Sequence, residues 1–145
     1  MNDHPAQKEI LQAFISEVWN EGRLEAVERY LAPRYTIHHD PGDAWEGKEL
    51  DQEGFRERLR LSRAPFPDQR FEILELFGDG SAVVMTWTWK GTHRGELAGF
   101  QPSGKIVEMS GATVYYFDEN ERICGHWQIA DRLGVFQQLR RNAGA

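Results

Sequence analysis

The first part of the chain carries apolar residues at helical spacing. In residues 5–20 they recur every three or four positions, at Ile10, Leu11, Phe14, Ile15, Val18 and Trp19. This spacing predicts an amphipathic helix that ends before Gly22. Two further helices are predicted over residues 24–31 and 48–63, and a short strand is predicted between them over residues 35–39.

The second part of the chain changes to the two-residue period of strands. The predicted strands cover residues 69–77, 81–93, 106–118 and 122–131, and a helical turn over residues 132–139 closes the chain. Helices followed by a meander of long strands are typical of an α+β fold. We therefore expect a curved antiparallel sheet wrapped around the N-terminal helices to form a cone with an internal pocket. No linker divides the chain, so residues 1–145 are expected to form one domain.

The alternation of side chains along a strand suggests where a site would lie. Trp87, Trp89 and His93 share one face of their strand, and Trp127 shares a face with Asp131. If these faces turn toward the helices, Asp131 and His93 lie in a cavity lined by indoles. An aspartate in such surroundings is a candidate general acid or base, and a nearby imidazole can orient it.

These residues also have simpler interpretations. Asp131 stands where a helix N-cap or a surface salt bridge is equally common, and His93 can be a partly exposed histidine at a strand end. His39 shares its parity with Tyr35 and Ile37, so it is the member of the His38–His39 pair expected to face inward. Because adjacent strand residues point to opposite faces, the pair does not supply converging metal ligands. We expect no metal site.

Composition narrows the possible partners. The 23 acidic and 17 basic side chains give a net charge of −6, which argues against nucleic acid or an anionic membrane as a partner. No apolar run approaches the ~20 residues that span a bilayer. The single cysteine, Cys124, excludes an internal disulfide and a thiolate zinc cage. These features favour a cytoplasmic protein with a small-molecule partner.

Apolar character on both faces of the predicted sheet suggests self-association. The face opposite the indoles carries Ala82, Val84, Thr86 and Thr88. Because the helices can cover only one face, the other needs a second cover. We expect a homodimer through this outer face.

Several segments, taken in order, resemble one protein family. They include residues 14–22 (FISEVWNEG), 39–41 (HDP), 91–95 (GTHRG), 131–134 (DRLG) and 137–139 (QQL). The chain is similar to the SnoaL-like polyketide cyclases, or ester cyclases, of the nuclear transport factor 2-like superfamily, over residues 8–139.

The resemblance implies an intramolecular aldol condensation on a flat aromatic polyketide ester, without metal or organic cofactor. It implies that Asp131 is the acid/base and that His93 and His39 line the pocket and stabilise an enolate oxygen. The candidate substrate-binding residues are Trp87, Trp89, Trp127, Trp45, Phe66, Met109 and Arg94. Two other functions stay open: a non-catalytic carrier of a small hydrophobic ligand, and an isomerase, dehydratase or epoxide hydrolase on the same cone.

Overall fold

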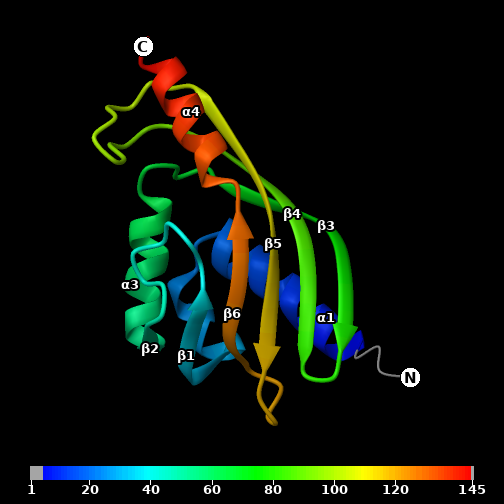
Figure 1. Ribbon diagram of the computed structural model, residues 1–145. Coiled ribbons are helices and arrows are strands. Elements are labelled where there is room, and N and C mark those ends of the chain that lie inside the picture. The colour runs from blue at the N-terminus through cyan, green and yellow to red at the C-terminus, as the bar shows by residue number, and fades with distance from the viewer. Residues whose placement is uncertain (1–4, 145) are drawn as a thin grey trace.

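The computed structural model describes residues 5–144, and its centre is one curved six-stranded sheet (Figure 1). The strands are β1 (Leu31–His39), β2 (Glu49–Asp51), β3 (Arg70–Asp79), β4 (Ala82–Thr92), β5 (Ile106–Phe117) and β6 (Ile123–Ala130). Their order across the sheet is β2-β1-β6-β5-β4-β3. The pair β1–β6 is parallel and every other pair is antiparallel. The predicted α+β fold is confirmed, with a mixed rather than a wholly antiparallel sheet.

The helices pack on the concave face of the sheet. They are α1 (Pro5–Phe14), which continues as a π-helical segment (Ile15–Asn20), then a 3-10 turn (Leu24–Ala26), α2 (Val27–Tyr30), α3 (Gln52–Arg63) and α4 (Arg132–Asn142). Helix α1 crosses behind the sheet and α3 stands beside β1 and β2, whereas α4 follows β6 at the opposite end (Figure 1). No helix within residues 5–144 is both long enough and apolar enough to cross a membrane.

Aromatic rings join the helices to the sheet. The buried ring of Phe14 on α1 packs against Phe55 on α3 and edge-on against Tyr115 on β5, with centroids 6.1 and 5.9 Å away. Tyr35 on β1 packs edge-on against the same Phe55 ring at 4.9 Å. Such edge-to-face pairs add to the stabilisation that comes from burying large apolar surfaces. They fix the helices over one end of the concave face and leave the other end open to a cavity.

Strand β1 starts earlier than predicted but ends at His39, as predicted. It begins at Leu31 rather than at residue 35 and contains Pro33, which is tolerated because the pairing with β6 is interrupted between Leu31 and Thr36. A second irregularity falls between Ile37 and His39, where one extra residue interrupts the pairing with β6. This β-bulge reverses the alternation of side chains beyond Ile37.

Candidate functional site

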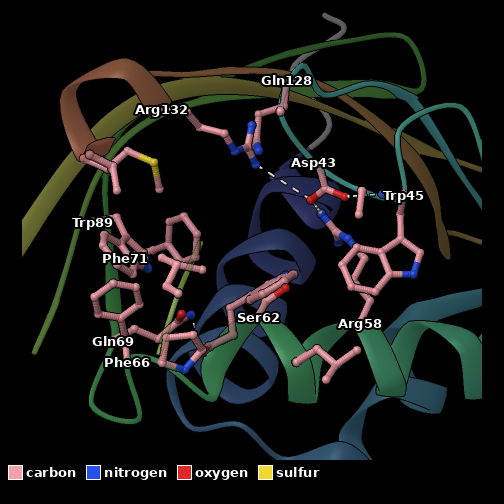
Figure 2. Close-up of a pocket in the computed structure, with 18 of the residues that line it drawn as sticks. Asp43, Trp45, Arg58, Ser62, Phe66, Gln69, Phe71, Trp89, Gln128 and Arg132 are labelled. Carbon is pink, nitrogen blue, oxygen red and sulfur yellow. Dashed lines mark hydrogen bonds and ion pairs between the residues drawn. The ribbon is translucent and has the colours of Figure 1, made fainter. Parts of the chain in front are cut away.

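A cavity of about 410 Å³ lies between the concave face of the sheet, α3, α4 and the loops that follow β1 and β4. One wall is apolar and is formed by the rings of Phe66, Phe71, Trp87 and Trp89 together with Met109. The facing wall is polar and is formed by Asp43, Arg58, Gln128 and Arg132. Figure 2 shows the rings of Phe66, Phe71 and Trp89 on one side of the cavity and Asp43 and Arg58 on the other.

The apolar wall is held in shape by ring contacts. Phe66 packs edge-on against Trp89, and Phe71 packs edge-on against Trp87, each at a centroid distance of 4.9 Å. Trp87 has room because Gly111 faces it, where a Cβ atom would lie 2.5 Å from the indole. A broad apolar surface of this kind suits the face of a flat hydrophobic molecule.

Asp43 places a carboxylate on the polar wall. Its Oδ2 accepts a hydrogen bond of 3.0 Å from Arg58 Nη2 and lies 3.7 Å from Arg132 Nη2. Its Oδ1 accepts a hydrogen bond of 2.7 Å from the backbone N–H of Trp45. The side chain therefore lies between two guanidinium groups (Figure 2), and its oxygens keep lone pairs that these donors do not use.

A second carboxylate, Asp40, lies fully buried behind the polar wall. It accepts hydrogen bonds from His126 Nε2 and Arg132 Nη1, both at 2.8 Å, from Gln128 Nε2 at 3.1 Å and from Arg58 Nη2 at 3.4 Å. Burial alone would raise the pKa of Asp40, but the hydrogen bond from His126 and the charge of Arg132 lower it to about 2. Asp40 is therefore an anion that fixes the donors around it.

These contacts determine the tautomer of His126. An ionised carboxylate only accepts hydrogen bonds, so Nε2 of His126 carries the proton that faces Asp40. The unprotonated Nδ1 then accepts from the hydroxyl of Tyr35 at 2.5 Å. Burial lowers the pKa of His126, although the hydrogen bond to Asp40 opposes this shift. His126 is thus a neutral ring whose two nitrogens are both engaged.

The orientation of Gln128 follows from the same reasoning. Trp87 Nε1 donates to Thr113 Oγ1 at 2.8 Å, and that hydroxyl donates to Gln128 Oε1 at 2.6 Å. The amide nitrogen of Gln128 is left to donate to Asp40. This series of hydrogen bonds links the apolar wall to the carboxylate of Asp40 and holds the Gln128 amide in one orientation.

The lowered pKa of His126 predicts a pH-dependent stability. In the unfolded chain the imidazole ionises near its ordinary pKa of 6.5. As the pH falls below that value, the unfolded state binds a proton that the folded state does not, so stability is lost until the pH passes the folded pKa. We expect the loss to stay within about 1.4 kcal/mol per pH unit.

Urea unfolding between pH 7.5 and 5 measures this effect. The fall in unfolding free energy should be smaller in His126→Gln than in the wild type. His39→Gln, which changes a partly exposed ring, should behave as the wild type. Equal pH slopes for the wild type and His126→Gln would contradict the prediction.

Five of the predicted binding residues do line the cavity: Trp45, Phe66, Trp87, Trp89 and Met109. Trp127 lies instead on the outer face, 40% exposed and stacked on His39 at a centroid distance of 4.6 Å. The expected inward face of β6 is thus wrong, because His126 and Gln128 are the residues that reach the cavity. His39 faces outward because the bulge reverses the alternation of β1, and the same reversal turns Asp40 inward.

Asp131 does not line the cavity. It is exposed and forms the N-cap of α4, where Oδ1 accepts a hydrogen bond of 2.9 Å from the backbone N–H of Gly134. The structure therefore places Asp131 as a helix N-cap, which was the simpler of its two interpretations. Arg94 is also exposed and lies outside the cavity lining.

His93 is buried but stands behind the cavity wall. Its ring packs against Phe66 at a centroid distance of 5.5 Å, and neither of its nitrogens has a hydrogen-bond partner within residues 5–144. Over the same residues, no three His, Cys, Asp or Glu side chains converge as metal ligands.

Sequence reasoning missed most of the polar wall. The sequence pattern does not single out Asp40 or Asp43 as site residues. Arg58 offered a usable signal, because it lies three residues after Phe55 and next to Leu59, within the apolar stripe of α3. A charged residue in such a stripe indicates a buried partner.

Comparisons with known proteins give a consistent result. A sequence model of the SnoaL-like polyketide cyclase family matches residues 9–139. A candidate polyketide cyclase from Acidithiobacillus ferrooxidans is 58% identical with a TM-score of 0.91, over 98% of this chain and 99% of that one. IdmH, a candidate polyketide cyclase from Streptomyces antibioticus, is 28% identical with a TM-score of 0.78, over 92% and 98%.

The fold also occurs in a protein with a different description. AclR, a candidate hydroxylase from Streptomyces galilaeus, has a TM-score of 0.78 at 19% identity, over 94% of this chain and 85% of that one. No curated protein matches the sequence. Because one fold can host different reactions, the similarity of fold does not identify the reaction, and the residues that line the cavity have to do so.

Proposed function

Because the chain belongs to the SnoaL-like polyketide cyclase family, we propose that it catalyses an enolisation that leads to intramolecular aldol condensation. The substrate class is a flat hydrophobic ketone or ester, and the reaction uses no metal or organic cofactor. The observation that carries this proposal is the cavity, in which an aromatic wall faces a carboxylate held between two guanidinium groups.

In this reaction Asp43 removes a proton from the carbon next to the substrate carbonyl. Arg58 and Arg132 stabilise the negative charge that develops on the oxygen. The enolate carbon then attacks a second carbonyl carbon of the same molecule, and the carboxylic acid of Asp43 returns its proton to the resulting alkoxide. Asp40 keeps both arginines in place throughout.

A bicyclic ketone, 2-tetralone, tests the first step, because its enolisation exchanges hydrogen for deuterium at C1 in heavy water. Proton NMR should record an exchange rate that rises linearly with protein concentration and saturates with 2-tetralone. Binding can be followed independently through the fluorescence of the tryptophans in the cavity wall. An exchange rate equal to that of buffer would contradict the proposed catalysis.

One observation favours a second function, the binding of a hydrophobic ligand without chemistry. Asp43 already accepts hydrogen bonds from Arg58 and from the backbone of Trp45, so each of its two carboxylate oxygens is engaged within the protein. Saturable binding of 2-tetralone without exchange would support this function over catalysis.

We further propose that the protein forms a homodimer through the outer face of the sheet. Cross-strand pairing places one apolar residue from each of four neighbouring strands in a row on this face: Phe77, Val84, Val114 and Trp127. Phe77 is 57% exposed and Trp127 is 40% exposed in the single chain. A continuous apolar row of this kind is a typical protein-interaction surface.

The substitution Ile129→Glu tests the dimer, because Ile129 adjoins this row and is 47% exposed. Sedimentation at micromolar concentration should give the mass of two chains for the wild type and of one chain for the variant. Gln137→Glu, which adds the same charge on α4, should leave the dimer intact. A single-chain mass for the wild type would contradict the prediction.

A further inference from the structure

The ring of Tyr115 lines the cavity and packs against neighbours from both the sheet and α1. Tyr115 lies on β5 and pairs across the sheet with His126, whose ring is 5.9 Å away between centroids. On its other side it packs against Phe14 of α1. The residue is 5% exposed and lines the cavity. Its position therefore does not depend on a mobile loop.

The hydroxyl of Tyr115 differs from those of the other tyrosines on this side of the sheet. The hydroxyl of Tyr35 donates a hydrogen bond to His126, and the hydroxyl of Tyr30 donates one to Glu17. No residue within the described part of the chain accepts a hydrogen bond from Tyr115. The hydroxyl oxygen is not among the fully buried side-chain atoms that lack a partner in this part of the chain. Because Tyr115 lines the cavity, this group is available for a ligand there.

The surroundings of Tyr115 keep its hydroxyl protonated. Burial raises the pKa of Tyr115 well above its usual value, although the nearby charge of Arg58 opposes the shift. At neutral pH the group is therefore a neutral hydrogen-bond donor. A neutral donor that feels the charge of Arg58 is suited to an oxygen that gains negative charge.

We propose that Tyr115 donates a hydrogen bond to the reacting carbonyl oxygen of the substrate and stabilises the enolate that forms there. This inference rests on the proposed function and adds a catalytic residue to it. The proton of Tyr115 stays on its own oxygen, while Asp43 takes the proton from carbon. The ligand is thus placed by two features: its flat apolar body lies on the indole wall and its carbonyl oxygen points toward β5.

A pair of ligands and a pair of variants test this role. The ligands are 2-tetralone and tetralin, which differ by the carbonyl group. The variants are Tyr115→Phe and, as a matched control, Tyr116→Phe. Tyr116 lies on the outer face, where its ring packs against His38. Removing a hydroxyl that has no protein partner should leave the melting temperature of Tyr115→Phe unchanged or higher.

We expect Tyr115→Phe to bind 2-tetralone about tenfold more weakly, as the loss of one hydrogen bond implies. Its affinity for tetralin should not change. In the exchange assay kcat should fall by about 10–100-fold and by more than KM rises, because the hydrogen bond strengthens as charge develops. Tyr116→Phe should match the wild type in every measurement.

The possible failures can be told apart. If Tyr115→Phe keeps the wild-type affinity for 2-tetralone and the wild-type exchange rate, Tyr115 is not the oxygen ligand, but the proposed catalysis stands. If the wild type does not prefer 2-tetralone to tetralin, the inference is overturned. If the wild type shows no exchange activity but prefers 2-tetralone to tetralin, and Tyr115→Phe loses that preference, Tyr115 holds the oxygen of a ligand that is bound without being converted.

Discussion

Asp43→Asn is expected to lower the rate of hydrogen–deuterium exchange at C1 of 2-tetralone by about 100-fold or more. The amide keeps the size of the carboxylate but cannot accept a proton from carbon, and general-base catalysis contributes about 10²–10⁴-fold. The substitution leaves Arg58 paired with Asp40, so the fold should persist. Exchange rates followed by NMR, together with a thermal melt of each protein, measure the effect.

Asp131→Asn is the matched comparison for this variant. The family resemblance implies that Asp131 is the acid/base, whereas its exposed N-cap position implies a structural role. Because asparagine is as good an N-cap as aspartate, Asp131→Asn should keep both its stability and its exchange activity. If Asp131→Asn loses exchange and Asp43→Asn keeps it, the base lies at the start of α4 and the assignment of Asp43 is wrong.

Asp40→Asn is expected to lower the free energy of unfolding by about 3–5 kcal/mol at pH 7. Removing one partner from a buried ionic cluster leaves the remaining groups without the charge and the acceptors that they were paired with. Arg58 keeps its ion pair with Asp43 at 3.0 Å, so the loss falls on Arg132 and on the buried donors of His126 and Gln128, which all bond to Asp40. Urea unfolding monitored by tryptophan fluorescence measures the loss.

The pH dependence of this loss provides a second check. The folded pKa of about 2 lies below the ordinary value of 3.8. The stabilisation from Asp40 is therefore fully present above about pH 5 and is lost as the pH falls toward 2. The gap between the wild type and Asp40→Asn should narrow over that range. Asp79→Asn, at an exposed hairpin, should match the wild type throughout, and an equally stable Asp40→Asn would contradict the role of the cluster.

The sequence was sufficient for most of the fold, because the signals for its elements are local. Apolar spacing predicted α1 and α3, and alternation with glycine-rich turns predicted β3 to β6 to within a few residues. The inward face of β4, with Trp87 and Trp89, also followed from alternation. The family resemblance was confirmed over nearly the same residues.

The polar wall could not be predicted, because it depends on contacts between distant segments. Alternation separates the two faces of β6 but does not say which one is buried, and the indole of Trp127 favoured the wrong face. Asp40 and His126 are 86 positions apart in the sequence, and only the bulge in β1 brings their side chains together. Their burial is possible because each supplies the partner that the other needs.

Asp40 also connects four elements that are far apart in the sequence. Arg58 comes from α3, Arg132 from α4 and His126 from the sheet, and Asp40 itself starts the loop after β1. An outward movement of α4 would break the ion pair between Arg132 and Asp40 and disrupt the polar wall. The loop after β4 meets α4 through the rings of Phe100 and Phe136, and such an apolar contact separates at lower cost. A ligand is therefore expected to enter and leave the cavity on the side of this loop, while the polar wall keeps its geometry.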